Sequence, residues 1–80
     1  MSETHNHKKL EFFVDAKRYE SDHESLTGAQ IKAQAGVEAE YQLFLEEEGD
    51  TPDLPVSDIQ AVTLSGRVKH FFAVPPATFG

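Results

Sequence analysis

The chain has 80 residues, no cysteine, and fourteen acidic against seven basic residues, which gives a formal net charge of −7. This length allows one small domain and is too short for two cores. Without cysteine there is no disulfide, zinc–thiolate site or catalytic thiol, which favours a cytoplasmic protein over a secreted one. The sequence has neither a signal segment nor a run of about 18 apolar residues, so we expect no export and no membrane span. The negative charge repels nucleic acid and anionic membranes, and a basic protein surface suits it better as a partner.

The first two predicted strands form a hairpin. In KKLEFFVD, apolar residues recur at every second position, which is typical of a half-buried strand. The inward-facing set is Leu10, Phe12 and Val14. After the connection DAKR, residues 18–22 predict a second strand that carries Tyr19 and Ser21 on the same apolar side. No Asn-Gly or other glycine pair supplies a primed turn, so the sequence leaves the register of the hairpin open.

Helix-end signals in LTGAQIKAQAGV agree on a short helix over residues 28–35. Thr27 and Gln30 have the T-x-x-Q spacing of a capping box, in which each side chain bonds the backbone amide of the other residue. The residues placed to form a hydrophobic staple are Leu26 and Ile31. Gly36 lies where a left-handed residue would end the helix. Two turns of helix are marginal alone, so we expect this helix to pack on a sheet.

The stretch EYQLFLEE predicts a third strand, in which three apolar residues share one face. These residues are Tyr41, Leu43 and Leu45. The following residues 47–62 contain two prolines, a glycine and several acids, so we predict a loop without a strand, with a helical turn near residues 57–60. The predicted anchors of this loop to the core are Leu54, Val56, Ile59 and Val62. Its acidic residues lack the spacing of calcium ligands and are interpreted as a solvated face.

The last predicted strand is VKHFFAV, residues 68–74. Apolar residues occur on both of its faces, so either face suits the interior. We predict that Val68, Phe72 and Val74 face the core.

The order hairpin, helix, strand, long loop, strand is that of the β-grasp, an α+β fold in which one short helix crosses a four-stranded mixed sheet. We expect the first and last strands to pair in parallel at the sheet centre. An antiparallel meander is the alternative, but the capped helix between the two halves favours a crossover. The predicted division is a flexible start at residues 1–7, a domain at 8–74 and a projecting tail at 75–80. His5 and His7 have no third ligand, so we predict no metal site.

Three stretches carry a resemblance to a known family: FFVDAKRYE, LTGAQIKAQAGV before EYQLFLE, and the ending HFFAVPPATFG. Together they resemble the ubiquitin superfamily, and more closely the bacterial multiubiquitin domain, from about Lys8 to Gly80. The resemblance implies a protein modifier, not an enzyme, in systems linked with bacterial defence against phage. It implies partners that resemble a ubiquitin-activating enzyme, a ubiquitin-conjugating enzyme and a metallo-isopeptidase. ATP would be used by the activating enzyme, and this chain would bind no cofactor.

The tail VPPATFG is the predicted working part of the protein. Pro75 and Pro76 donate no backbone hydrogen bond and favour polyproline II geometry, so strand pairing should end at Val74. At about 3.1 Å per residue, the last six residues reach roughly 19 Å, which is enough to enter a narrow cleft. The carboxylate of Gly80 would be adenylated and then passed through the conjugating enzyme to a target protein. The predicted tail-recognition residues are Pro75, Pro76, Thr78 and Phe79, the last standing where eukaryotic modifiers have their penultimate glycine.

Aromatic residues on the sheet face away from the helix predict a partner-binding surface, with self-association as a further use of it. The candidates are Phe13, Phe44 and Phe71, with Phe72 as the alternative to Phe71. In the opposing interpretation, the long loop covers these rings or they form a satellite core. His23 and His70 are interpreted as ordinary surface or strand residues. Lys17 and Lys32 are predicted to be exposed and able to accept another copy.

Two other functions remain open from the sequence. A sulfur carrier would bear a thiocarboxylate on Gly80, although the missing diglycine counts against it. A non-covalent β-grasp interaction module would work without residues 75–80. No Ser/His/Asp arrangement, paired carboxylates or phosphate-binding loop supports an enzyme.

Overall fold

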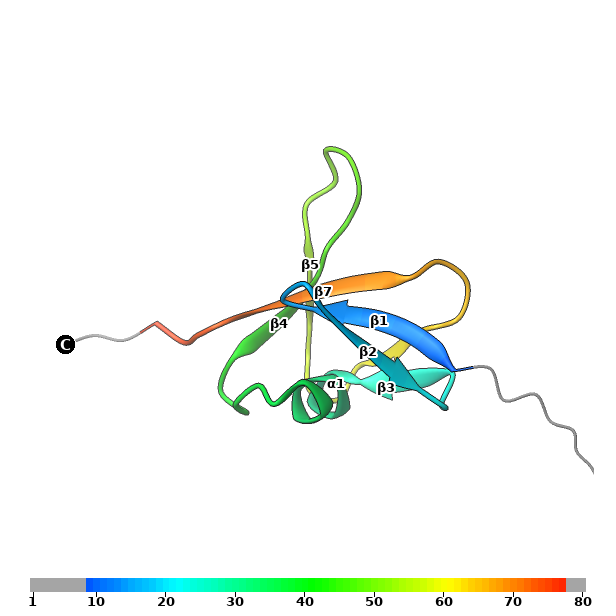
Figure 1. The fold of residues 1–80 in the computed structure, drawn as a ribbon. Coiled ribbons are helices and arrows are strands. Elements are labelled where there is room, and N and C mark those ends of the chain that lie inside the picture. The colour runs from blue at the N-terminus through cyan, green and yellow to red at the C-terminus, as the bar shows by residue number, and fades with distance from the viewer. Residues whose placement is uncertain (1–8, 78–80) are drawn as a thin grey trace, which may run out of the picture.

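The computed structural model describes residues 9–77 and folds them into a mixed β-sheet with one helix across one face (Figure 1). The elements are β1 (Leu10–Val14), β2 (Lys17–Ser21), β3 (Ser25–Thr27), α1 (Gly28–Ala35), β4 (Gln42–Leu45), β5 (Leu54–Val56), β6 (Ala61–Thr63) and β7 (Lys69–Val74). The main sheet has the order β2-β1-β7-β4-β5, in which β1 and β7 are parallel and all other neighbours are antiparallel. The predicted β-grasp arrangement, with the first and last strands paired in parallel inside the sheet, is confirmed.

The sheet has five strands, where four were expected. The segment predicted as a loop contributes two strands. β5 pairs with β4 and becomes the edge strand of the main sheet, and β6 forms a separate two-stranded sheet with β3. Pro55 lies within β5. A proline is tolerated there because β5 is an edge strand, with a neighbour on one side only. The prediction that prolines exclude a strand from this segment is therefore wrong.

The hairpin of β1 and β2 closes through a two-residue turn. Asp15 and Ala16 both have positive φ angles, of 52° and 69°, as a type I′ turn requires. The turn sets the register that the sequence leaves open, with Phe12 opposite Tyr19 and their rings stacked at a centroid distance of 5.8 Å. Ser21 is buried, so the predicted apolar side of β2 is confirmed.

The helix has the predicted bounds and the predicted ends. The amide of Gln30 donates to Oγ1 of Thr27 over 3.2 Å, and the amide of Thr27 donates to Oε1 of Gln30 over 2.8 Å, which completes the capping box. Gly36 adopts the left-handed conformation, with φ of 73°, and ends the helix. The sequence signals alone were sufficient here because each of them acts within a few residues.

The turn between β5 and β6 lies against the start of α1. The amides of Gly28 and Ala29 donate to the carbonyl oxygens of Gln60 and Asp58 over 3.0 and 3.1 Å. These bonds satisfy amides that have no partner inside the helix. The approach is so close that a Cβ on Gly28 would lie 2.2 Å from the carbonyl oxygen of Ser57. Glycine is therefore required at the first position of this helix.

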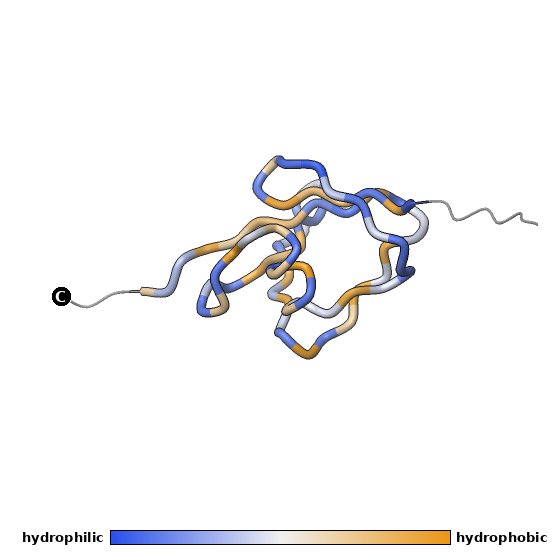
Figure 2. Tube along the Cα trace, turned by 60° about the horizontal axis from the view of Figure 1, so that its bottom comes forward, coloured by the Kyte–Doolittle hydropathy of each residue, from blue (hydrophilic) through white to orange (hydrophobic). Residues whose placement is uncertain are grey.

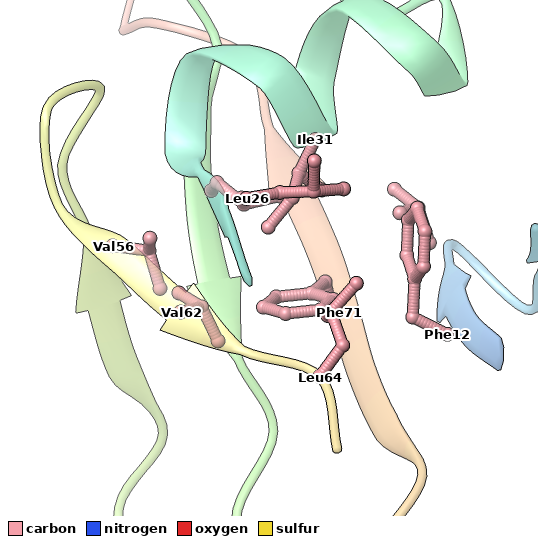
Figure 3. Close-up of a cluster of buried hydrophobic side chains, with 9 residues drawn as sticks. Phe12, Leu26, Ile31, Val56, Val62, Leu64 and Phe71 are labelled. Carbon is pink, nitrogen blue, oxygen red and sulfur yellow. The ribbon is translucent and has the colours of Figure 1, made fainter. Parts of the chain in front are cut away.

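The core lies between α1 and the sheet (Figure 3). Its buried residues are Phe12, Val14, Leu26, Ile31, Leu43, Val56, Val62, Leu64 and Phe71. Val56 and Val62 are thus the correctly predicted anchors of the long segment. Leu54 and Ile59 are 49% and 89% exposed, so their prediction as anchors is wrong.

The predicted inner face of β7 is also wrong. The set predicted to face the core was Val68, Phe72 and Val74. Two of these side chains are 40% and 39% exposed, whereas Phe71 is 3% exposed. The register with β4 explains the difference, because residues directly opposite each other point to the same face. Phe71 lies opposite Leu45, which packs on the core, and Phe72 lies opposite Phe44 on the other face.

Candidate functional site

The tail begins where the sheet ends. β7 ends at Val74, as predicted, and residues 75–77 are exposed and belong to no strand or helix. The chain leads away from the sheet there (Figure 1), and the orange end of β7 gives way to pale blue at the start of the tail (Figure 2). Pro75 and Pro76 have no N–H group with which to extend the ladder. The predicted tail residues Thr78, Phe79 and Gly80 lie outside the described residues.

The sheet face opposite α1 carries two stacked aromatic pairs. The rings of Phe13 and His70 have centroids 4.8 Å apart and are inclined by 9°. The rings of Phe44 and Phe72 have centroids 5.2 Å apart and are inclined by 10°. The first pair joins β1 to β7 and the second joins β4 to β7, so the four rings follow three adjacent strands. We call these four residues the outer aromatic face.

The structure partly agrees with the predicted partner surface. Phe13 and Phe44 lie on the outer aromatic face, and Phe71 does not, because it is in the core. Phe72 lies on the outer aromatic face instead of Phe71. His70 is exposed and belongs to this face, which sequence reasoning missed. Its position two residues before Phe72 indicates the same face, once the inner side of β7 is known.

The outer aromatic face is no satellite of the core. Its three phenylalanines are half-buried, and within residues 9–77 none of them belongs to the core cluster or to the apolar residues packed against it. The two rings of each stacked pair cover one another in part. A half-covered aromatic band of this kind is typical of a surface that another protein contacts.

A charged network borders the face on the β2 side. Nε of Arg18 lies 2.7 Å from Oε2 of Glu11, and its second guanidinium nitrogen lies 2.7 Å from Oε2 of Glu20. Arg18 is directly opposite Phe13 in the hairpin. The hydrogen bond that Arg18 donates to Glu11, with the negative charges of Glu11 and Glu20, raises the pKa of Arg18 above its ordinary value. The network thus places the positive charge of Arg18 beside Phe13, and the carboxylates of Glu11 and Glu20 neutralise that charge.

The acidic segment after β4 lies at the surface, as predicted. Glu48 forms an ion pair of 2.7 Å with Arg67, and the amide of Glu47 donates to Oδ1 of Asp53 over 3.1 Å. In the described part of the chain, no group of three or more His, Cys, Asp or Glu side chains is placed to hold a metal ion.

The two candidate acceptor lysines differ in exposure. Lys17 is exposed on β2, as predicted, whereas Lys32 is buried, so its prediction as an exposed acceptor is wrong. The Nζ of Lys32 donates to the carbonyl oxygens of Ala39 and Tyr41 over 2.7 and 2.9 Å, and it lies 2.8 Å from Oδ1 of Asp58. These three acceptors satisfy the whole ammonium group.

The helical spacing explains why Lys32 is buried. It lies four residues after Gly28 and one residue after Ile31, which are both buried, so it belongs to the stripe of α1 that faces the protein. This spacing was readable from the sequence. The three acceptors that bond the ammonium group of Lys32 were not readable from the sequence, because they come from the segment after α1 and from the turn after β5.

The parallel first and last strands and the helix across one face of the mixed sheet define a protein of the β-grasp class. A family model described as Multiubiquitin matches residues 10–75, and the chain belongs to this family. No curated protein and no solved structure matches the chain. Over residues 9–77, the structure has no helix that is long and apolar enough to cross a membrane.

Proposed function

We propose that this protein is a bacterial ubiquitin-like modifier that is joined through Gly80 to target proteins, in a system that defends against phage. The observation that carries the proposal is the membership of residues 10–75 in the Multiubiquitin family. The end of β7 at Val74, followed directly by two prolines, supports it because it gives the body an extended exit. The bacterial origin and the role in defence come from the family resemblance.

In the proposed reaction the protein is a substrate throughout. The Gly80 carboxylate attacks ATP in the activating enzyme, forms an acyl-adenylate and releases pyrophosphate. A carrier residue of the conjugating enzyme then displaces AMP, and an amine or hydroxyl of the target displaces the carrier, which forms an isopeptide or ester bond. A metallo-isopeptidase reverses this by adding water to the bond. Glycine suits the reacting position because it has no Cβ to obstruct the approach to its carboxylate.

The proposal divides recognition between the tail and the body. Pro75 and Pro76 would keep the tail extended, and Thr78 and Phe79 would be recognised in the channel that leads to the active site of the activating enzyme or isopeptidase. Phe79 would be the apolar anchor, so the channel must admit an aromatic ring. The outer aromatic face would dock on the surface of the same partners.

Deletion of Gly80 tests the proposal. Protein that ends at Gly80 is incubated with ATP and the activating and conjugating enzymes, and the products are measured by intact mass. We expect an ATP-dependent adduct between this protein and the protein to which it is joined, with a mass equal to the sum of their two masses less one water. Protein without Gly80 should give no adduct. In a separate denaturation experiment it should unfold at the same urea concentration as the full chain. An adduct that persists without Gly80 would refute conjugation through this carboxylate.

A second candidate function is a non-covalent interaction module, which the outer aromatic face favours. In that case residues 1–74 alone should bind the partner as well as the full chain, and Phe44→Asp should abolish binding. Ile59→Ser is the matched control, because Ile59 is 89% exposed but lies on the turn beside α1. A concentration-dependent dimer that Phe44→Asp abolishes would identify the partner as a second copy. Replacement of one oxygen of Gly80 by sulfur, without a protein adduct, would instead identify a sulfur carrier.

A further inference from the structure

The turn between β1 and β2 contacts β7 just before the tail. The amide of Asp15 donates to the carbonyl oxygen of Phe71 over 3.0 Å. Its carboxylate oxygen Oδ1 accepts a hydrogen bond from the amide of Ala73 over 3.1 Å. One turn residue therefore bonds β7 at two points that are two residues apart.

The hydrogen bond from the Ala73 amide to the Asp15 carboxylate takes the place of a backbone bond to β1. In the parallel pair, Val14 lies opposite Phe71, and β1 ends there, whereas β7 continues to Val74. The Ala73 amide on that side has no further β1 residue to bond, and the carboxylate of Asp15 supplies the acceptor. On the other side, β4 pairs with Ala73 and Val74. The last residues of β7 are thus bonded on both sides.

The conformation of Asp15 makes this contact possible. Its φ of 52° lies in the left-handed region, which Asp and Asn adopt more readily than most residues. That conformation lets the chain turn back into β2 while the side chain bonds β7. Asn would retain the conformation and an acceptor oxygen, and Gly would retain only the conformation.

We infer that Asp15 is a positioning residue that fixes the direction in which the tail leaves the body. Pro75 and Pro76 have no amide N–H, so the N–H groups of Ala73 and Val74 are the last before the tail that the sheet can bond. A polyproline segment is stiff over several residues, so it carries the direction set at its root outward. The consequence for conjugation rests on the proposed function. A tail that is already aligned loses less conformational entropy when it enters an enzyme channel.

The matched variants are Asp15→Gly and Asp15→Asn in the full chain. In Asp15→Gly, amide hydrogen exchange at Ala73 should be faster by roughly three- to ten-fold, the scale of one net hydrogen bond. In Asp15→Asn it should stay near the wild-type rate. Exchange at Leu43 serves as the control for global stability, since this residue is fully buried in the neighbouring strand. The ¹⁵N order parameter of Ala77 should fall in the Gly variant only.

Kinetics of activation provide the second readout. With the activating enzyme, Asp15→Gly should raise KM for the modifier roughly ten-fold, the scale of ordering one more backbone residue, and leave kcat unchanged. Asp15→Asn should restore KM. Unchanged exchange at Ala73 in the Gly variant, or faster exchange without a change in KM, would overturn the inference. If the wild-type protein is not activated at all, the proposed function fails, and exchange at Ala73 together with the order parameter of Ala77 still decides whether Asp15 holds the root of the tail.

Discussion

Lys32→Met should strongly destabilise the protein, because Lys32 bonds three segments together. Its Nζ bonds two carbonyl oxygens after α1, at Ala39 and Tyr41, and the carboxylate of Asp58 after β5. The side chain of Lys32 is 6% exposed and that of Asp58 is 56% exposed. Methionine keeps most of the apolar length of lysine and removes the charge, so it isolates the polar contacts.

The magnitude follows from these contacts. Hydrogen bonds to a charged group contribute about 1.5–3 kcal/mol each, and the two carbonyl bonds are the main loss. The ion pair adds only about 0–1 kcal/mol, since water reaches Asp58 and solvates it when Lys32 is absent. The two carbonyl bonds therefore account for about 3–6 kcal/mol, and we expect Lys32→Met to lower the free energy of unfolding by about that amount. An 80-residue domain has about 4–12 kcal/mol in total at about 0.05–0.15 kcal/mol per residue.

Urea denaturation followed by circular dichroism measures this loss. Lys17→Met is the matched control, because Lys17 is exposed, and should change the free energy of unfolding by less than about 0.5 kcal/mol. Asp58→Asn separates the two contributions and should cost less, about 1.5–3 kcal/mol, since it leaves both carbonyl bonds in place and removes only the charged partner of the buried ammonium group. A Lys32→Met protein as stable as the Lys17→Met protein would refute the reasoning, as would a loss reproduced in full by Asp58→Asn.

Five further substitutions test the fold by urea denaturation. Phe71→Ala should cost about 3–5 kcal/mol, as for a core aromatic, whereas Phe72→Ala should cost about 1–2 kcal/mol; equal losses would contradict the assigned faces of β7. Gly28→Ala should cost about 1–3 kcal/mol, because its Cβ would lie 2.2 Å from the carbonyl oxygen of Ser57, and a neutral effect would show that this approach is not tight. Thr27→Ala should cost about 1 kcal/mol through loss of the cap, with Thr27→Ser near neutral; an equal loss in both variants would exclude the capping hydrogen bond as the cause.

The features predicted correctly from the sequence are those that depend on neighbours in the chain. The capping box and Gly36 determine α1 within a few residues, and the alternation in β1 identifies its buried side without knowledge of its partners. The parallel pairing of the first and last strands also followed, because one helix between two hairpin-like halves leaves few other topologies.

The wrong predictions concern features that depend on distant partners. The inner face of β7 is set by its register with β4, where Phe71 meets Leu45. Lys69 shares the parity of the buried Phe71, so the inner side of β7 also carries a charged residue. It is half-buried near the end of the sheet, where its Nζ bonds the carbonyl oxygen of Arg67 over 3.3 Å. Long polar side chains reach solvent from such positions, so one lysine does not identify an outward face.

The candidate site was predictable in part for the same reason. Phe13 and Phe44 were placed on the outer face by alternation alone. His70 shares the parity of Phe72, but its stacking on Phe13 was not readable, because Phe13 lies far away in the sequence. The role of Asp15 was not readable at all, since nothing in the hairpin sequence indicates that its carboxylate bonds Ala73.

Two prolines with opposite consequences explain why the tail begins where it does. Pro55 lies inside β5, an edge strand with one neighbour, so its lack of an N–H group is compatible with pairing. Pro75 follows the point where both neighbours of β7 stop, because β1 ends opposite Phe71 and the first residue of β4, Gln42, pairs with Val74. Pro75 has no N–H group with which to extend either ladder, so β7 ends at Val74. The exit of the tail is thus determined by where β1 and β4 stop together with Pro75, and a proline alone would not have determined it.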